Sequence, residues 1–155
     1  MLVMMESIQQ KIIENGERGK STWFYIDEVH VLLNSPFSAE YLRQMWKKVR
    51  KQWGLCTGIT QNIVDLLMSE TSTTMLSNSA FILLLNQSAK DIEKIEEALE
   101  ISEDQLNYVI DSPSGTGLIK CGSKMVPFEN VITKDSELYR LYNTNMYEKM
   151  AEKKH

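Results

Sequence analysis

Apolar and polar positions along the chain predict helices that alternate with short buried strands. In residues 2–15 the apolar side chains recur three and four positions apart, which is the spacing of a helix that buries one face. Residues 22–33 begin with the continuous apolar run Trp23–Ile26, which is typical of a strand buried on both faces of a parallel sheet. Residues 37–53 return to helical spacing, and Gly54 is expected to end that helix.

The middle of the chain continues this alternation. Residues 55–60 and 80–85 are further short apolar segments that predict strands, and a helix is expected to start at residues 63–68. Residues 70–78 are rich in serine and threonine and predict a polar connection. Because buried strands alternate with helices, the pattern predicts an α/β fold with a mainly parallel sheet and flanking helices.

The last third of the chain predicts short helices, a β-hairpin and a final helix. We expect residues 1–145 to form one folded unit and residues 146–155 to form a charged tail that frays. In chain order, the candidate features are a helix cap at Ser88 with Asp91, a second cap at Ser102 with Gln105, hairpin strands at 118–121 and 125–131 around Gly122 and Ser123, and a helix at 137–150.

Composition narrows the class of protein. The chain has 155 residues, of which 43% are hydrophobic and 25% charged, as in an ordinary globular domain. Its net charge of −4 argues against a surface that is basic throughout and grips nucleic acid. The cysteines are Cys56 and Cys121 and the histidines are His30 and His155, so neither a structural zinc site nor a disulfide framework is expected, and a reducing, intracellular compartment is indicated. No apolar run is long enough to span a bilayer.

The segment with the most chemical information is Trp23–Glu28, in which four apolar residues precede two carboxylates. This is the Walker B pattern of nucleotide hydrolases. A buried strand presents the first carboxylate, Asp27, to Mg²⁺ at its carboxyl end, and the second, Glu28, can deprotonate an attacking water. The alternative is a strand that simply ends in an acidic turn. His30 follows the pair, and we interpret it as a supporting or surface residue rather than a metal ligand.

A second candidate element, Gly58-Ile59-Thr60-Gln61-Asn62, follows the next predicted strand. The carboxyl ends of parallel strands open on one edge of a sheet, so Gln61 is expected to face the same crevice as Asp27 and Glu28. A glutamine in that place can sense a γ-phosphate or position water. The alternative is an ordinary polar helix start, capped by Thr60 or Asn62.

The third candidate element is the basic face of the helix predicted over residues 37–53. A solvated helix face is the plain interpretation of such a charge run. The functional interpretation is an arginine supplied to a phosphate in a neighbouring subunit, because guanidinium binds phosphate through a bidentate fork. Arg50 is the first candidate and Arg43 the second. The basic residues of this face include Lys47, Lys48, Arg50 and Lys51.

The glycine-rich stretch Ser114-Gly115-Thr116-Gly117 is not a phosphate-binding loop. A P-loop requires the string GxxxxGK[ST], and that string occurs nowhere in the 155 residues. The stretch is therefore interpreted as a turn before the hairpin.

Together these segments resemble the C-terminal half of the ATPase domain of conjugation and type IV secretion ATPases, the VirB-four class, also called TraE- or TraC-like. The resemblance covers residues 1–145 and depends on the order and spacing of its motifs. These motifs are Ile26-Asp27-Glu28-Val29-His30, Trp46 to Gly54, Gly58-Ile59-Thr60-Gln61-Asn62, Ser77-Asn78-Ser79 and Val126-Pro127-Phe128.

The resemblance implies a partial RecA-like P-loop NTPase fold of the HerA–FtsK type. It implies an ATP- and Mg²⁺-dependent motor at the cytoplasmic, inner face of the cell membrane, which works with secretion-channel or conjugation subunits and forms a homo-hexamer in the full-length parent. Contact with nucleic acid is expected only through that parent complex. By position, the resemblance makes Glu28, Gln61 and Arg50 catalytic and makes Asp27 and Thr60 cofactor-binding, with Asp27 holding Mg²⁺ through a water.

The sequence departs from this family at one point. The Walker A loop should lie far upstream of Asp27, and only 26 residues precede Asp27 here. We therefore expect the chain to be the C-terminal portion of a larger motor that hydrolyses ATP negligibly by itself, because the phosphates lack their backbone cradle and lysine.

Two alternatives remain open. Asp27-Glu28-Val29-His30 spells the DExH box of helicases, although Thr60-Gln61 stands where such helicases carry a Ser-Ala-Thr motif. The other alternative is a non-catalytic interaction module derived from an ATPase, in which the acidic pair is inert.

Overall fold

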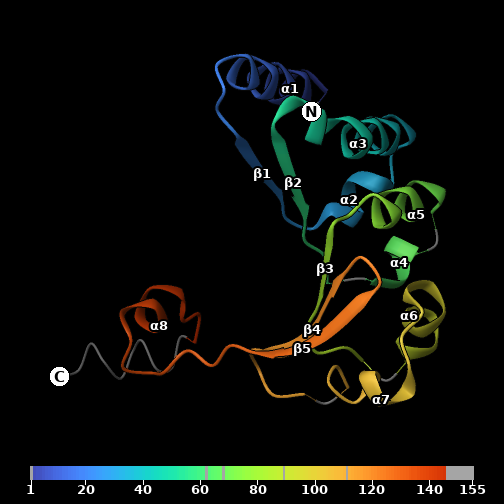
Figure 1. Cartoon of the computed structure of the whole chain (residues 1–155), viewed down its shortest axis with the longest axis vertical. Coiled ribbons are helices and arrows are strands. Elements are labelled where there is room, and N and C mark those ends of the chain that lie inside the picture. The colour runs from blue at the N-terminus through green and yellow to red at the C-terminus, as the bar shows by residue number, and fades with distance from the viewer. Residues whose placement is uncertain (1, 62, 68, 89, 111, 146–155) are drawn as a thin grey trace.

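The computed structural model describes residues 2–61, 63–67, 69–88, 90–110 and 112–145, and Figure 1 shows their arrangement. The described residues form helices and two separate sheets. In chain order the elements are α1 (Leu2–Glu17), β1 (Thr22–Ile26), α2 (Val29–Leu33), α3 (Pro36–Lys48), the 3-10 helix η1 (Val49–Gln52), β2 (Gly54–Gly58), α4 (Ile63–Leu67), α5 (Glu70–Ser77), β3 (Phe81–Leu84), α6 (Ile92–Leu99), α7 (Glu103–Leu106), β4 (Thr116–Cys121), β5 (Lys124–Glu129) and α8 (Glu137–Tyr142).

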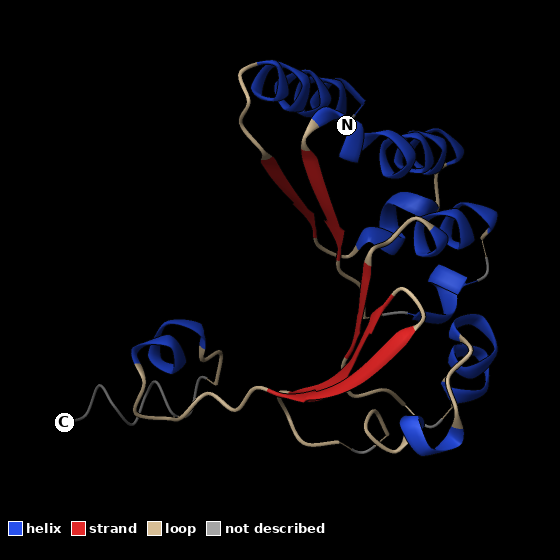
Figure 2. Ribbon diagram, in the orientation of Figure 1, coloured by secondary structure: helices blue, strands red, loops and turns tan. Residues whose placement is uncertain are grey.

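The first sheet pairs β1 and β2 in parallel, in a register that runs from Thr22 opposite Gly54 to Ile26 opposite Gly58. Helices α1 and α3 lie to one side of these strands (Figure 2). Parallel strands need a crossover connection, and α2 and α3 supply it between β1 and β2. This unit carries the α/β character that the alternation of strands and helices predicts.

Only one face of the β1–β2 sheet is covered by the described part of the chain. Phe24 and Cys56 pack into the core beneath the helices. On the opposite face, Trp23 is 61% exposed and Tyr25 is 58% exposed, and Leu55 is exposed beside them. The expectation that Trp23–Ile26 is buried on both faces is therefore wrong, because α1 and α3 lie on one side and no described element covers the other.

The second sheet has the order β3-β4-β5, and both of its pairings are antiparallel. The hairpin expected around Gly122 and Ser123 is confirmed as β4 and β5. The segment 80–85 does form a strand, β3, but it joins this hairpin instead of the parallel pair. A parallel sheet therefore accounts for one of the three strand pairings among the described residues.

Apolar side chains form one interior that continues from the first sheet to the second. One cluster beneath β1 and β2 contains the buried residues Val29 and Leu42, and another beneath β3 and β4 contains Leu118. The partly buried side chains of Ile63 and Leu76 pack against both clusters. Helices α4 and α5 thus join the two sheets through shared packing, and Figure 2 shows them beside the junction of the sheets.

Two expectations for the middle of the chain are wrong. Residues 70–78 were expected to be a polar connection, yet α5 occupies Glu70–Ser77. Ser69 accepts a hydrogen bond from the backbone N–H of Ser72 at 3.1 Å, and this cap starts the helix. The pairing of Ser88 with Asp91 is not a capping box, because α6 begins after Asp91 without a side-chain cap.

Two further expectations have mixed outcomes. The capping box of Ser102 and Gln105 is present at the start of α7 and is confirmed. The final helix, expected over residues 137–150, ends at Tyr142, and residues 143–145 are not helical. The tail expected at 146–155 lies outside the described residues. No helix of the described chain is both long enough and apolar enough to cross a membrane.

Gly54 is a position where a side chain would not fit. A Cβ atom there would overlap Val49 Cγ2 and lie 2.9 Å from Ile12 Cγ2, both in the core beneath β2. We therefore expect Gly54→Ala to lower the free energy of unfolding in urea by about 1–3 kcal/mol, the range for overpacked cores. Ser21→Ala, at an exposed position just before β1, is the control and should change it by less than about 0.5 kcal/mol. Equal effects of the two substitutions would show that the core does not pack closely against Gly54.

The two cysteines should differ in reactivity. Burial raises the pKa of the Cys56 thiol from 9.0 to about 12, and its Sγ lies 3.7 Å from Met45 Sδ, whereas Cys121 is exposed. Since the thiolate is the reactive form, Ellman's reagent should modify Cys121 in the native chain and Cys56 only after unfolding. The variants Cys121→Ser and Cys56→Ser show which cysteine gives rise to each phase of the reaction with Ellman's reagent. A native Cys121→Ser chain that reacts as fast as the unfolded one would contradict this.

The same raised pKa sets a pH window for stability. The folded chain keeps the Cys56 proton to a higher pH than the unfolded chain does. Its contribution to the free energy of unfolding is therefore complete below pH 9 and is lost as the pH rises through about 12. In urea unfolding curves recorded above pH 9, Cys56→Ala should show a weaker pH dependence than the parent chain.

Candidate active site at the ends of the two parallel strands

Backbone hydrogen bonds fix the two segments that follow β1 and β2 against each other. The N–H of Ile59 donates to the carbonyl of Ile26 at 2.8 Å, and the N–H of Val29 donates to the carbonyl of Ile59 at 2.9 Å. These bonds extend the parallel pairing beyond the strands. Residues 27–28 and residues 60–61 are therefore neighbours in space, as the sequence predicts for the carboxyl ends of adjacent parallel strands.

Glu28 and Gln61 are in direct contact. Gln61 Nε2 donates a hydrogen bond to Glu28 Oε1 at 2.6 Å. This is a short, charge-assisted bond between residues 33 positions apart, and it links the end of β1 to the end of β2. The structure thus brings together the predicted base and the predicted sensor, while their roles in hydrolysis stay predictions.

Glu28 has a backbone conformation that is unfavourable for its residue type. Its φ of 50° and ψ of 47° place it in the left-handed region, which costs an L-residue roughly 1–2 kcal/mol. The Asp27 carboxylate stabilises this turn, because Asp27 Oδ1 accepts a hydrogen bond from the Glu28 N–H at 3.0 Å. In this conformation the Glu28 side chain contacts Gln61, and α2 begins at the next residue. Backbone strain of this kind, at a residue with an ionisable side chain, is typical of functional sites.

His30 and Thr60 complete the cluster around Glu28. His30 Nδ1 lies 2.9 Å from Thr60 Oγ1 and 3.2 Å from Glu28 Oε2. Glu28 Oε2 is buried and accepts no hydrogen bond in this geometry. His30 is mostly buried, with a side chain that is 20% exposed. The interpretation of His30 as a supporting residue therefore fits its position better than a place on the surface.

Asp27 is exposed at the tip of the turn. Among the residues that the structure describes, no group of three or more His, Cys, Asp or Glu side chains is placed to hold a metal ion. Magnesium usually retains several waters and takes one or two carboxylates together with substrate phosphates. An exposed aspartate just after the carboxyl end of β1 fits that donor set, and it does not fit an ion held by protein alone.

Arg50 lies at the other end of the sheet from the acidic pair. It belongs to η1, which precedes β2, and it is exposed. Since β1 and β2 run in the same direction, this end is separated from the acidic pair by at least the four steps between the five residues of a strand, roughly 13 Å at 3.3 Å per step. The structure therefore does not bring Arg50 to Glu28 and Gln61 within one chain.

Arg43, the second candidate arginine, is occupied on its own helix. Its Nε and Nη2 donate to the two carboxylate oxygens of Glu40 at 2.6 Å each. Hydrogen bonds from Arg43 and then Gln44 lower the pKa of Glu40 from 4.5 to about 2. The remaining basic residues of this face, Lys47, Lys48 and Lys51, are exposed, as the plain interpretation of a solvated helix face predicts.

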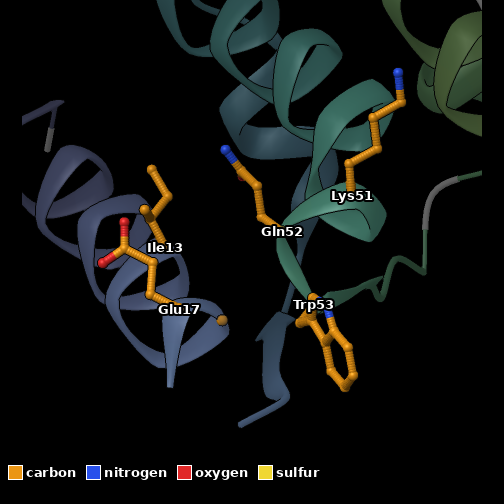
Figure 3. Close-up of a pocket in the computed structure, with 6 residues that line it drawn as sticks. Ile13, Glu17, Lys51, Gln52 and Trp53 are labelled. Carbon is orange, nitrogen blue, oxygen red and sulfur yellow. The ribbon is translucent and has the colours of Figure 1, made fainter. Parts of the chain in front are cut away.

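A cavity of about 340 Å³ opens between the end of α1 and the segment Lys51–Trp53 (Figure 3). A second cavity of about 410 Å³ lies between α5, α6 and β4. Neither of these two cavities is lined by Asp27, Glu28, Thr60 or Gln61. The first cavity is lined by Ile13, Gly16, Glu17, Lys51, Gln52 and Trp53.

Other motifs of the resemblance have packing roles that their residue types alone do not reveal. Trp46 Nε1 donates to Ser79 Oγ at 3.2 Å, which ties α3 to the segment before β3. A Cβ atom on Gly58 would lie 3.2 Å from Val29 Cγ1 and 3.4 Å from the Trp46 ring. The backbone of Ile59 is the most important contributor that sequence reasoning missed, because a hydrogen bond from a main-chain group leaves no signal in the side-chain pattern.

Comparison with known families assigns this arrangement to a class. The TraG P-loop domain family matches residues 1–149, and the chain belongs to that family. Among solved structures, VirB4 of Thermoanaerobacter pseudethanolicus is similar, with 28% sequence identity and a TM-score of 0.66. That similarity confirms the α/β fold class and the resemblance to the VirB-four class. No curated protein matches the chain.

The match with VirB4 covers 73% of this chain and 32% of the VirB4 chain. The chain thus spans about a third of the solved relative that it matches.

The strain at Glu28 predicts a difference between two neutral replacements. Asparagine tolerates the left-handed region far better than glutamine does, and both remove the charge. Glu28→Asn should therefore have a free energy of unfolding that is higher than that of Glu28→Gln by on the order of 1 kcal/mol. Urea unfolding of the two variants tests this. A Glu28→Gln chain as stable as Glu28→Asn would show that the turn is not strained.

Proposed function

We propose that this chain supplies the carboxylate side of an ATP-hydrolysing site in a type IV secretion or conjugation motor. The observation that carries the proposal is the 2.6 Å hydrogen bond from Gln61 to Glu28, at the carboxyl ends of two parallel strands, in a member of the TraG P-loop domain family. Family membership also favours this function over a DExH-type helicase.

Glu28 is the general base in the proposed reaction, and Gln61 controls it. The Gln61 amide now donates to Glu28 Oε1, so a γ-phosphate oxygen that accepts from Gln61 would free Oε1 to take a proton from the attacking water. The hydrogen bond between the two residues thus couples nucleotide binding to activation of the base. Thr60, beside Gln61, contributes to the same phosphate-facing edge.

Asp27 is the residue that would hold Mg²⁺, through a water. Its Oδ1 accepts from the Glu28 N–H, and the side chain is exposed, so the carboxylate is oriented by the turn and open to a hydrated ion. When bound, the ion neutralises phosphate charge.

The remainder of the site must come from polypeptide outside these 155 residues. The sequence holds no GxxxxGK[ST] string, and the exposed face of β1 and β2 carries Trp23, Tyr25 and Leu55. An uncovered apolar face of this kind is suited to packing against further elements of a larger domain. We propose that a segment with the phosphate-binding loop covers it, since the matched VirB4 chain is about three times longer than the part matched here.

Arg50 acts on a neighbouring subunit in this proposal. Arg50 is exposed at the opposite end of the sheet from the acidic pair, a strand length of roughly 13 Å away, and this placement favours contact with a phosphate of a neighbouring subunit. A ring such as a homo-hexamer of the parent motor would bring the Arg50 end of one subunit to the Glu28 end of the next. The motor would work at the cytoplasmic, inner face of the cell membrane with secretion-channel or conjugation subunits, and would meet nucleic acid only through that complex.

The test is a chimera in which this chain replaces the matched third of VirB4 of Thermoanaerobacter pseudethanolicus. We expect the isolated chain to give no ATP turnover and the chimera to turn over ATP. Glu28→Gln in the chimera should lower kcat by about 10²–10⁴-fold, the usual contribution of a general base. Glu103→Gln, at an exposed carboxylate on α7, is the matched control and should have no effect.

Other outcomes discriminate the alternatives. A chimera that binds ATP and shows no Glu28-dependent turnover would favour the non-catalytic interaction module. Robust, Glu28-dependent turnover by the isolated chain would show that no second segment is needed.

A further inference from the structure

His30 lies where it can restrain the base of the proposed site. It stands on α2, two residues after Glu28, and its ring nitrogen Nδ1 is 3.2 Å from Glu28 Oε2. We propose that His30 is a positioning residue for Glu28, whose Nδ1–H holds Oε2 while Gln61 holds Oε1. This inference rests on the proposed function, because that function makes Glu28 the base. The contact between His30 and Glu28 is observed independently of it.

The state of Glu28 Oε2 is the first reason. This oxygen is buried and has no hydrogen-bond partner in the present geometry. A buried carboxylate oxygen without a donor is costly, so the groups that face it are expected to supply one. His30 Nδ1 lies 3.2 Å from this oxygen, which is within the donor–acceptor range of an N–H···O hydrogen bond.

The position of Thr60 is the second reason. Thr60 Oγ1 lies 2.9 Å from the same Nδ1 atom. A hydroxyl can donate or accept, so Thr60 fits either form of the ring. A ring without hydrogen on Nδ1 would point its lone pair at the buried Glu28 Oε2, which is repulsive. A ring with hydrogen on Nδ1 is attracted to both oxygens, and this is the form that the cluster favours.

The arrangement has a consequence for the proposed reaction. Gln61 is expected to leave Glu28 Oε1 when a γ-phosphate arrives, and the carboxylate would then be held only at its other oxygen. A donor fixed on Oε2 keeps Oε1 aimed at the same point, so the base does not have to be reoriented in each cycle. His30 would therefore affect the catalytic step without touching the nucleotide.

The hydrogen on Nδ1 can be observed in the isolated chain, without nucleotide. His155→Ala leaves His30 as the single histidine, and long-range ¹⁵N–¹H spectra of its imidazole show which nitrogen bears hydrogen. We expect hydrogen on Nδ1 in this chain and its loss from Nδ1 when Glu28→Ala is added. A bare Nδ1 in the parent, or hydrogen retained on Nδ1 after Glu28→Ala, would overturn the proposal.

The positioning effect is read from the side-chain amide of Gln61. Asparagine places its amide nitrogen near the site of Nδ1, whereas glutamine places its own near Nε2. We expect His30→Asn to keep the Gln61 amide signals close to those of the parent, and His30→Gln to shift them toward free amide values. The Gln105 amide, whose Oε1 accepts from the Ser102 N–H at 3.1 Å, is the internal control for a folded chain. Equal spectra for His30→Asn and His30→Gln would refute a role for Nδ1.

The two levels of the proposal fail separately. If the NMR effects are absent but the chimera shows Glu28-dependent turnover, His30 has no role in the site and the proposed function stays intact. The NMR effects without turnover would retain the His30–Glu28 contact in a site that does not hydrolyse ATP. In an active chimera, His30→Gln should lower kcat at least tenfold with KM unchanged, and His30→Asn should restore most of it.

Discussion

The parallel pairing of β1 with β2 is the constraint on which the rest of the site depends. Two backbone hydrogen bonds through Ile59 carry this pairing past the strand ends, and they hold the Asp27–Glu28 turn against Thr60 and Gln61. The side-chain contacts among Glu28, Gln61, His30 and Thr60 then follow as local consequences. The core beneath the sheet supports the same pairing, because Gly54 and Gly58 allow Ile12, Val49 and Trp46 to approach β2 closely.

Much of this arrangement could be predicted from sequence because its determinants are local or periodic. The helical spacing of residues 2–15 and 37–53, the apolar run before Asp27 and the turn at Gly122 all act within a few residues, and the structure contains the elements that they predict. The proximity of Glu28 and Gln61 also followed, since the chain direction of two parallel strands fixes which ends meet.

What could not be predicted depends on partners distant in sequence. The strand at 81–84 is as apolar as β1, and nothing in its own residues shows that it pairs with the hairpin at Leu118 instead of the parallel strands. Helix α5 depends on a cap at Ser69 and on burial of Met75, which composition alone hides. The left-handed turn at Glu28 carries no glycine or asparagine to signal it, because strain is tolerated there only when surrounding contacts impose it.

The uncovered face of the first sheet carries a tryptophan, Trp23, whose fluorescence can report whether the face is covered. Trp23 and Tyr25 lie with ring centroids 6.4 Å apart on that face, and both are largely in contact with solvent. An indole in water emits at longer wavelengths than one in an apolar environment. Any polypeptide that covers this face would therefore move the emission of Trp23 to shorter wavelengths, while Trp46, already partly buried and bonded to Ser79, would be little affected, and Trp53, which is 60% exposed after η1, would add a long-wavelength background. Binding of the proposed covering segment would be visible in the fluorescence of the unlabelled chain.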